Sequence, residues 1–201
     1  MKYQIWRMIE NKVKIASNTF IIHPLGESAL VLMAEKISLT DIHHTALAIE
    51  KVLKNEIIDI VTAYQSITIY FDALAVSWDY LLEKLSSIAL FDDQKIKIET
   101  HEIIVDFEKG LDWQMMEAAT NLSRKQIISL FLEKKYTVAM LGFIPGFIYL
   151  EGLNKRLACP RKKAPRIKTP KGSIGIGGMQ AGIYALSSPS GWQIIGQMTT
   201  S

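Results

Sequence analysis

The stretch from Gly142 to Gly196 restricts the possible folds of this chain more than any other segment. It contains ten of the 12 glycines and five of the six prolines. It also contains eight of the 23 Lys and Arg residues, and no Asp or Glu follows Glu151. Glycine permits positive φ and close approach of the backbone to a ligand, and proline stiffens a loop by fixing φ. The stretch therefore predicts a rigid, basic site that is lined by backbone and suited to an anion.

The net charge of +3 hides an uneven distribution along the chain. Residues 1–151 hold 15 basic and 20 acidic residues, whereas residues 152–201 hold eight basic and no acidic residues. A basic tail of this kind favours an acidic partner or small anions. Binding of duplex nucleic acid is the less favoured alternative, because no helix-turn-helix or zinc-finger pattern accompanies the charge. We therefore expect no nucleic-acid partner.

The cysteine count and the hydropathy indicate the compartment. Cys159 is the only cysteine, so the chain cannot form an intramolecular disulfide, and a reducing, cytoplasmic compartment is expected. No apolar run reaches the roughly 18 residues that a membrane-spanning helix needs. The first residues lack the apolar region and the cleavage site of a signal peptide. The sequence therefore predicts a cytoplasmic protein without a membrane partner.

The first half of the chain predicts a two-layer α/β sandwich, so the fold class is α+β. Helices with one apolar face are expected at about residues 40–54, with Ser38 or Thr40 as the cap, and at about residues 77–90. The expected strands are residues 19–22, 29–33, 58–62, 67–71 and 95–105. Their order predicts two helices on one face of a mostly antiparallel sheet. The predicted organisation is an N-terminal extension, 1–18, followed by the α+β domain, 19–97.

Residues 98–201 change character and predict a second domain. Two short helices are expected near residues 112–120 and 124–134, the second opened by a capping box at Ser123. A strand over residues 136–141 and several short β segments separated by turn signals follow. Such a series predicts a small β-barrel or a sandwich.

The first candidate site is the turn at Pro145-Gly146, which has the composition of a type II turn. Two aromatic residues, Phe143 and Phe147, flank it. One interpretation is a buried turn with aromatic side chains in the core. The other is a turn that presents backbone N–H groups beside an aromatic wall, as in a ligand pocket.

Arg161 and Arg166 form the second candidate site, because each follows a proline. A guanidinium group is planar and matches the geometry of a carboxylate or phosphate, and a preceding proline would hold it in place. The alternative is a solvated basic loop, which is the interpretation for Lys162, Lys163 and Lys168.

The third candidate is the run from Gly172 to Gly178. It lacks the strand and helix context of a Rossmann motif and is not a Walker A loop. Successive small residues can still form a nest of N–H groups for an anion. The alternative is a glycine-rich strand packed closely in a barrel. The candidate residues of the run are Ser173, Gly175, Gly177 and Gly178. Gln180 and Tyr184 add hydrogen-bonding side chains at the rim of this candidate site.

No catalytic set is complete in the sequence. The four histidines are scattered and none has metal-ligand spacing, so no metal site is predicted. Cys159 has no histidine near it in sequence, which argues against a nucleophile. The chain also has no G-x-S-x-G elbow. The catalytic residues therefore stay unknown.

These residues together resemble a family. The run GFIPGFIYLEGL, followed by PRKKAPRIKTPKGSIGIGGMQAGIY and SSPSGWQIIG, resembles the B subunit of bacterial 5-oxoprolinase. This is the KipI-like family, also called allophanate hydrolase subunit 1. In the first half, PLGESALVL and DIVTAYQSITIYFD are similar to two further segments of the family. The resemblance covers about residues 19–197.

The resemblance implies a KipI-type N-terminal α+β domain and a C-terminal cyclophilin-like β-barrel domain, here truncated at its C-terminus. It implies an ATP-dependent complex that cleaves 5-oxoproline to glutamate, with ATP as co-substrate. The implied partners are the KipA-like C and LamB/YcsF-type A subunits, and the chain is expected to be inactive alone. A related module forms the carboxyltransferase part of urea carboxylase. The alternative function is that of a family member that inhibits a sensor histidine kinase.

The family resemblance gives the candidate residues a chemical role. Arg161, Arg166 and N–H groups near Gly175–Gly178 are expected to hold the substrate carboxylate or phosphoryl oxygens. The sequence departs from the family at several places. Phe131 stands where the family usually has His, and Gln197 stands where it has Arg.

Overall fold

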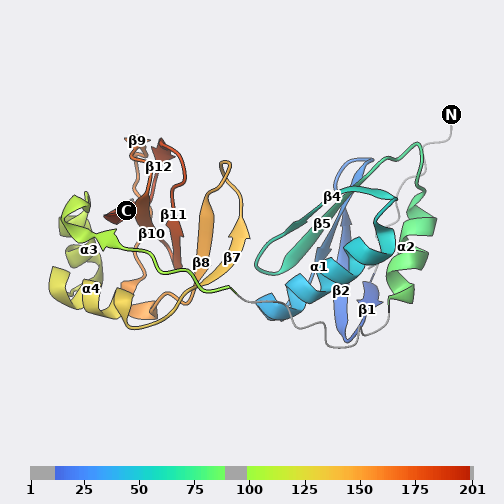
Figure 1. Ribbon diagram of the computed structural model, residues 1–201, viewed down its shortest axis with the longest axis horizontal. Coiled ribbons are helices and arrows are strands. Elements are labelled where there is room, and N and C mark those ends of the chain that lie inside the picture. The colour runs from blue at the N-terminus through green and yellow to red at the C-terminus, as the bar shows by residue number, and fades with distance from the viewer. Residues whose placement is uncertain (1–11, 89–98, 200–201) are drawn as a thin grey trace. The chain divides into compact units, whose positions relative to one another are not determined.

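The computed structural model describes residues 12–88 and 99–199 (Figure 1). The chain divides into two compact units, residues 1–98 and residues 99–201. Each unit has a hydrophobic core of its own. Within the described ranges, no helix is both long and apolar enough to cross a membrane.

The first unit is built on a five-stranded antiparallel sheet with the order β1-β2-β3-β5-β4. The strands are β1 (Lys12–Ile15), β2 (Asn18–Pro24), β3 (Ala29–Met33), β4 (Ile57–Thr62) and β5 (Ser66–Phe71). Strand β1 lies within the predicted extension, 1–18, and pairs with β2, with Val13 opposite Phe20. The sheet therefore begins before residue 19, because the apolar residues of β1 are buried in the core.

Two helices, α1 (Leu39–Leu53) and α2 (Trp78–Ser87), cover one face of this sheet (Figure 1). Ser38 and Ser77 cap them, since each hydroxyl accepts an N–H three residues further on, at 3.0 and 3.3 Å. The apolar faces of both helices pack on the inner side chains of the strands. The predicted α+β class is confirmed for this half of the chain.

The predicted strand at residues 95–105 does not close the first unit. Residues 95–98 lie outside the described residues, and residues 99–104 form no strand. A two-residue strand, β6 (Val105–Asp106), pairs instead with β13 (Gln193–Met198) of the second unit. Alternation of apolar side chains indicates a half-buried strand, but it does not say which sheet the strand joins.

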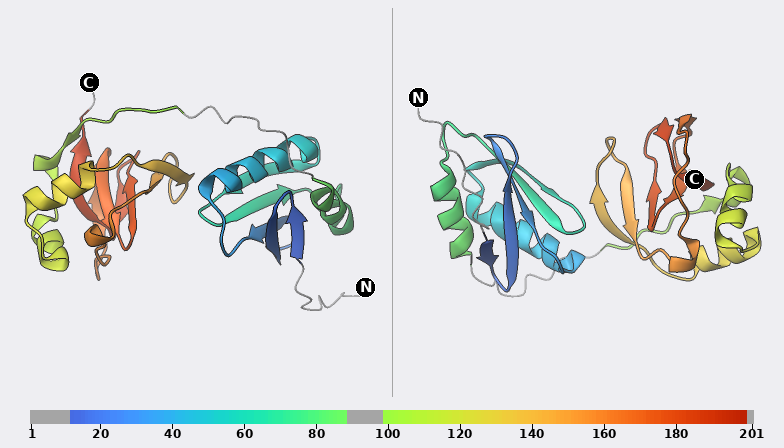
Figure 2. Two further views of the ribbon diagram at one scale, coloured as in Figure 1. Left: turned by 90° about the horizontal axis from the view of Figure 1, so that it is seen from below. Right: turned by 180° about the vertical axis from the view of Figure 1, so that it is seen from behind.

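The second unit contains a six-stranded antiparallel sheet with the order β6-β13-β10-β11-β8-β7. Its other strands are β7 (Thr137–Leu141), β8 (Ile148–Glu151), β10 (Ser173–Gly177) and β11 (Gln180–Ile183). A second, two-stranded sheet pairs β9 (Arg166–Thr169) with β12 (Ser188–Ser190). Figure 2 shows this unit from two further directions.

The predicted β-barrel is wrong for the described residues, because the six-stranded sheet is open. Closing a sheet into a barrel requires its two edge strands to pair with each other. Among residues 12–88 and 99–199, β6 and β7 are the edges, and each pairs with its inner neighbour alone, β13 or β8. The turn signals correctly indicated short strands, and the strand predicted at residues 136–141 is β7, but these signals carry no information on closure.

Helices cover one face of this sheet. They are α3 (Trp113–Thr120) and α4 (Arg124–Leu132), with single turns η1 (Phe107–Lys109) and η2 (Lys155–Leu157) beside them. Ser123 forms the predicted capping box with Gln126. Ile174 and Ile176 of β10 belong to the core cluster beneath the helices. The intervening glycines of β10 therefore face the opposite side of the sheet.

Candidate functional site

The glycine face of the second sheet carries a cluster of aromatic rings. The ring of Phe147 makes edge contacts with Tyr149, Tyr184 and Trp192, with centroid distances of 4.8, 4.7 and 5.6 Å. A Cβ atom on Gly177 would lie 2.6 Å from the Trp192 ring, and one on Gly182 would lie 2.7 Å from the Phe147 ring. The rings can approach the sheet this closely only because these positions lack a side chain.

The turn at Pro145-Gly146 is a type II turn, as predicted. The N–H of Phe147 donates to the carbonyl of Ile144 at 3.1 Å, and Gly146 has a φ of +75°. The two flanking aromatic residues differ, because Phe147 is buried and the side chain of Phe143 is 62% exposed. Phe147 thus belongs to the core, and Phe143 is the aromatic surface that the turn presents.

The glycine run forms a closely packed strand rather than a free loop. Strand β10 is paired on both sides, with β11 and with β13, so its backbone serves the sheet. Ser173 is buried, and the N–H of Gly178 donates to the carbonyl of Cys159 at 2.7 Å. Gln180 follows the hairpin turn as the first residue of β11. The predicted anion nest at Gly175–Gly178 is therefore not formed, and the alternative of a packed strand describes this segment.

Arg166 is held by a carboxylate that the sequence did not reveal. Its Nη2 atom lies 2.7 Å from Oδ1 of Asp112, and the Nζ atom of Lys162 lies 2.6 Å from the same oxygen. Oδ2 of Asp112 accepts the N–H of Ile194 at 2.7 Å. Asp112 is 5% exposed, and the Lys162 side chain is 20% exposed. The prediction that Lys162 is merely solvated is wrong, because Lys162 and Arg166 both form an ion pair with the carboxylate of Asp112.

The electrostatics keep Asp112 charged. Burial acts to raise the pKa of Asp112, but the hydrogen bonds from Arg166, Ile194 and Lys162 and the charge of Arg166 outweigh it. The pKa of this carboxyl is therefore lowered from its ordinary value of 3.8. At neutral pH the group of Asp112, Lys162 and Arg166 contains two positive charges and one negative charge.

One nitrogen of Arg166 has no hydrogen-bond partner in the part of the chain that the structure describes. Its Nη1 atom is buried and makes no hydrogen bond with any of the described residues. A buried donor without a partner is costly, by about 1–3 kcal/mol. The neighbouring Nη2 atom, by contrast, is anchored on Asp112 at 2.7 Å.

Tyr184 lies close to the arginines. Its hydroxyl is 2.5 Å from Oγ of Ser190, which also accepts the N–H of Trp192 at 3.0 Å. Burial raises the pKa of Tyr184, and the bond to Ser190 and the charges of Arg161 and Arg166 only partly offset it. Tyr184 is therefore a neutral phenol at physiological pH.

The structure brings some of the predicted site residues together and not others. Arg161 lies over the Trp192 ring at 5.6 Å, and Phe147 contacts both Trp192 and Tyr184. The charges of Arg161 and Arg166 both act on Tyr184. Sequence reasoning missed the remaining members, namely Asp112, Lys162, Tyr149, Ser190 and Trp192. One signal could have revealed Asp112: residues 152–201 contain no acid, so any buried arginine there needs a carboxylate from earlier in the chain.

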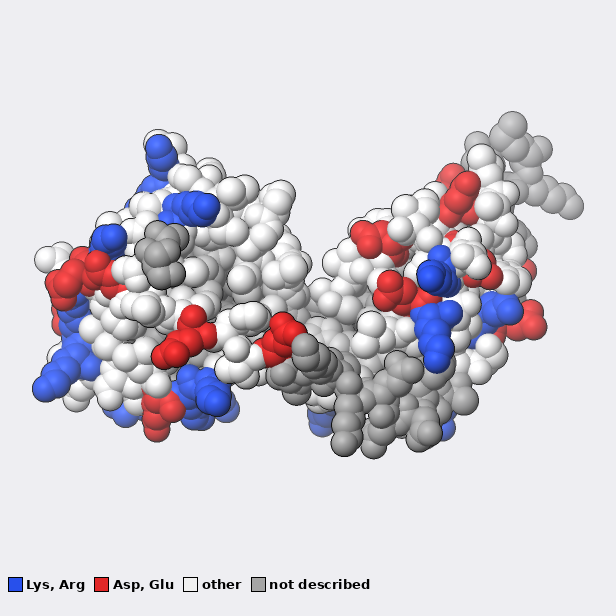
Figure 3. All heavy atoms as spheres, in the orientation of Figure 1, with Lys and Arg blue, Asp and Glu red and all other residues white. Residues whose placement is uncertain are grey.

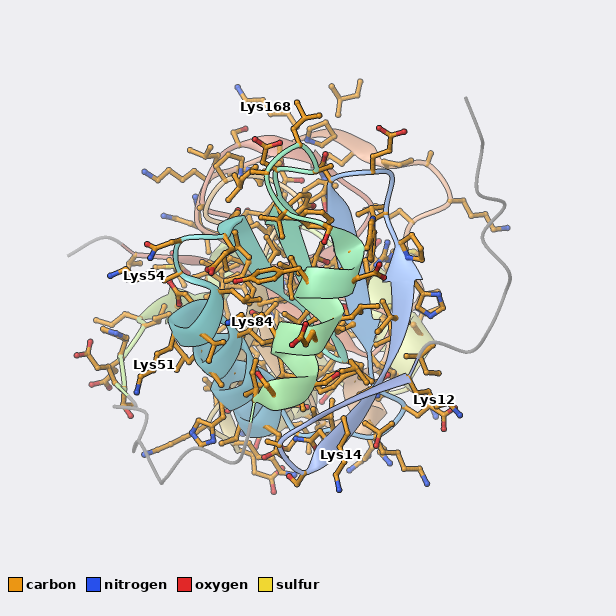
Figure 4. The ribbon with its side chains drawn as sticks, turned by 90° about the vertical axis from the view of Figure 1, so that its right-hand side faces the viewer. Lys12, Lys14, Lys51, Lys54, Lys84 and Lys168 are labelled. Carbon is orange, nitrogen blue, oxygen red and sulfur yellow. The ribbon has the colours of Figure 1, made fainter. Side chains whose placement is uncertain are left out.

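The charge split of the sequence does not produce a uniformly basic surface. Residues 99–201 contain 13 basic and eight acidic residues, so acids before residue 152 share a unit with the basic tail. Figure 3 shows both signs of charge on the face of the second unit that it presents. In the first unit, Lys12, Lys14, Lys51 and Lys54 are exposed (Figure 4).

Comparison with known proteins identifies the family. Residues 20–201 match the carboxyltransferase domain, subdomain C and D. The chain is 35% identical to the 5-oxoprolinase B subunit of Bacillus subtilis (strain 168), over 88% of this chain and 81% of that protein. It is also 35% identical to the 5-oxoprolinase B subunit of Haemophilus influenzae, over 87% of this chain and 84% of that protein.

A similar fold occurs in a longer solved protein. The crystal structure of TTHA0988 matches with a TM-score of 0.73 and 28% sequence identity, over 86% of this chain and 35% of that chain. The fold, the match to the family and the two named relatives agree with one another. The chain therefore belongs to the carboxyltransferase-domain family, subdomains C and D, within the KipI-like group of 5-oxoprolinase B subunits.

Proposed function

We propose that this chain is the B subunit of an ATP-dependent 5-oxoprolinase complex that cleaves 5-oxoproline to glutamate. The KipA-like C subunit would complete the site, the LamB/YcsF-type A subunit would complete the enzyme, and ATP would be the co-substrate of the complex. Two relatives that align over more than four-fifths of their length and are named as B subunits of 5-oxoprolinase support this assignment. No observation on the described residues favours the alternative, inhibition of a histidine kinase.

The excess positive charge of the group of Asp112, Lys162 and Arg166 carries the proposal, together with the partial exposure of the Arg166 side chain, which is 23% exposed. 5-Oxoproline has a single carboxylate, which is ionised at neutral pH, and a five-membered lactam ring. A guanidinium group binds a carboxylate through short, charge-assisted hydrogen bonds. In the proposed site, Arg166 takes the substrate carboxylate, Arg161 adds positive charge nearby, and the exposed ring of Phe143 contacts the apolar carbons of the lactam.

The remaining groups support binding rather than bond cleavage. Tyr184 keeps its proton, so it serves as a hydrogen-bond donor and not as a base. Burial and the charge of Asp112 raise the pKa of Cys159, and the charge of Lys162 only partly offsets this, so the thiol stays protonated and is a poor nucleophile. Because Tyr184 and Cys159 both stay protonated, neither supplies a base or a nucleophile. This agrees with the proposal that the chain is inactive alone and shares its site with a partner.

The reaction gives the arginines a second task. A lactam carbonyl is a weak electrophile, and phosphorylation of its oxygen by ATP would make the carbonyl carbon easier to attack. Negative charge then develops near the ring, where fixed positive groups stabilise it. In the proposal Arg161 and Arg166 provide this stabilisation from this chain's side of the shared site.

The decisive experiment is reconstitution. The chain is co-purified with the KipA-like and LamB/YcsF-type subunits, and glutamate and ADP formation from 5-oxoproline is measured. Arg166→Ala is expected to reduce turnover at least about a hundredfold, the loss typical of a charge-assisted contact in a site. Lys168→Ala is the matched control, since Lys168 is an exposed residue of the same strand β9. A complex that forms but does not consume 5-oxoproline would disprove the proposal.

A further inference from the structure

The five-stranded sheet of the first unit has one face that its helices leave uncovered (Figure 2). The inner side chains of the strands pack on α1 and α2. Side chains alternate along a strand, so the intervening residues of the same strands point to the opposite side. We call this side the outer face. Its central residues are Ile21, Val31, Met33, Val61, Thr68 and Tyr70.

The outer face is apolar at positions where a solvated face is usually polar. An antiparallel sheet with one face in water normally alternates apolar and polar residues. Strand β3, Ala29–Met33, is instead apolar at all five positions, which is the pattern of a strand covered on both faces. Its inner side chains, Leu30 and Leu32, are buried in the core, but Val31 is partly exposed and Met33 is 45% exposed. The sequence of β3 therefore indicates that something covers the outer face.

The apolar side chains of the outer face are neighbours and not scattered single residues. Cross-strand pairing places Ile21 of β2 beside Met33 of β3. It also places Val31 of β3 and Val61 of β4 on either side of Thr68 in β5. The apolar surface thus extends across four strands. A contiguous exposed apolar surface of this kind marks an interaction site.

Charge on the outer face lies at two opposite corners. Lys12 and Lys14 are the outward residues of the edge strand β1 (Figure 4). Asp59 belongs to the other edge strand, β4. Through the strands between them, Lys12 is in register with Met33 of β3 and Asp59 with Ala29, four residues away. The outward positions of the described strands carry no other Lys, Arg, Asp or Glu, so the face has a basic corner, an apolar centre and an acidic corner.

We propose that the outer face binds the outer face of a second copy of this chain. In a dimer with two-fold symmetry every contact occurs twice, so the surface must be complementary to itself. Opposite charges at opposite corners meet this condition. A two-fold axis places Lys12 and Lys14 of each copy against Asp59 of the partner subunit, with the apolar centres between them. The proposal concerns the first unit and does not rest on the proposed function.

The size of the outer face sets the expected strength of the dimer. Five strands about 4.8 Å apart and about five residues long form a face of about 20 by 17 Å, so two copies would bury roughly 700 Å² in all. Stable interfaces of standard size bury about 1,600 Å². We therefore expect a reversible dimer with a Kd in the micromolar range or above.

Sedimentation equilibrium of the full chain, from about 5 to 500 μM, measures the association. The chain is expected to be monomeric at the low end and dimeric at the high end. Met33→Glu places a charge in the apolar centre and should raise the Kd at least about tenfold. Leu74→Glu is the matched control, because Leu74 is 99% exposed in the loop after β5, outside the outer face, and its Kd should be unchanged. A chain that stays monomeric, or a Kd that Met33→Glu does not alter, would overturn the proposal.

Charge reversal distinguishes a second copy from any other occupant of the outer face. The double variant Lys12→Glu/Lys14→Glu and the variant Asp59→Lys should each associate more weakly than the wild type, because like charges then meet at both corners. In an equimolar mixture, opposite charges meet at both corners of the heterodimer, so an affinity near that of the wild type is expected.

Circular dichroism checks that each of these variants is folded. If the double variant is not, Lys14→Glu alone takes its place, and its mixture with Asp59→Lys should associate more tightly than either variant by itself. A mixture that associates no better than the separate variants would show that the two outer faces do not meet.

Discussion

Arg166 and Asp112 are 54 positions apart in the sequence, and their side chains form an ion pair of 2.7 Å in the interior of the second unit. The pair joins the start of strand β9 to the start of helix α3. Because the tail that contains Arg166 has no acidic residue of its own, the carboxylate must come from the earlier part of the unit. The site therefore exists only when these two segments are packed together.

The first prediction concerns the stability of this contact. Asp112→Ala leaves Arg166, Lys162 and the N–H of Ile194 without their common partner, so a loss of about 3 kcal/mol in the free energy of unfolding is expected. Asp106→Ala, which removes a more exposed cap, is expected to cost about 1 kcal/mol or less. Urea denaturation followed by tryptophan fluorescence measures both. Equal losses of unfolding free energy in the two variants would mean that the buried ion pair stabilises the protein no more than the exposed cap does.

The second prediction concerns pH. The folded pKa of Asp112 lies below its ordinary value of 3.8, so its contribution to stability is complete above that pH and is lost as the pH falls through the folded pKa. The stability difference between the wild type and Asp112→Asn should therefore be constant from about pH 6 to 8 and shrink below about pH 4. Urea denaturation at a series of pH values tests this. A stability difference between the two proteins that grows on acidification would show that the pKa of Asp112 is raised in the folded protein and not lowered.

Local features of the fold were predictable from the sequence, because their causes lie within a few residues. The type II turn at Gly146 requires a positive φ, which proline followed by glycine favours. The capping box at Ser123 needs only a glutamine three residues later. The amphipathic period likewise predicted α1 and α2 to within a few residues.

Features that depend on distant contacts were not predictable in the same way. The partner of Asp112 in β13 is 82 positions away, and Trp192 joins the site because glycines of a neighbouring strand make room for it. The glycine run was therefore open to two interpretations, an anion nest and a packed strand, until the pairing of β10 was known. The barrel prediction failed for a related reason, since closure depends on pairing of the two edge strands, which single-strand patterns do not specify.

The third prediction tests the glycine face. In Gly177→Ala the new Cβ would lie 2.6 Å from the Trp192 ring, so the ring must move, and a loss of about 1–3 kcal/mol is expected from overpacking. Gly142→Ala is the matched control, because its Cβ would meet only the Met140 side chain at 3.6 Å. Chemical denaturation measures the loss of stability, and tryptophan fluorescence reports the shift of the ring. A Gly177→Ala protein as stable as Gly142→Ala would show that the rings are not closely packed on the sheet.

The fourth prediction concerns the buried hydroxyl pair of Tyr184 and Ser190, whose oxygens are 2.5 Å apart. Ser190→Ala removes the partner of the Tyr184 hydroxyl and of the Trp192 N–H, and about 1–3 kcal/mol of stability should be lost. The double variant with Tyr184→Phe should lose less than the sum of the two single variants, because no phenol is then left unpaired. Ser188→Ala, in the same strand, is the control, since the Ser188 hydroxyl donates to the carbonyl of the next residue at 3.2 Å and not to another buried side chain among the described residues. Denaturation of the four proteins completes the cycle, and strict additivity would mean that the two hydroxyls do not interact.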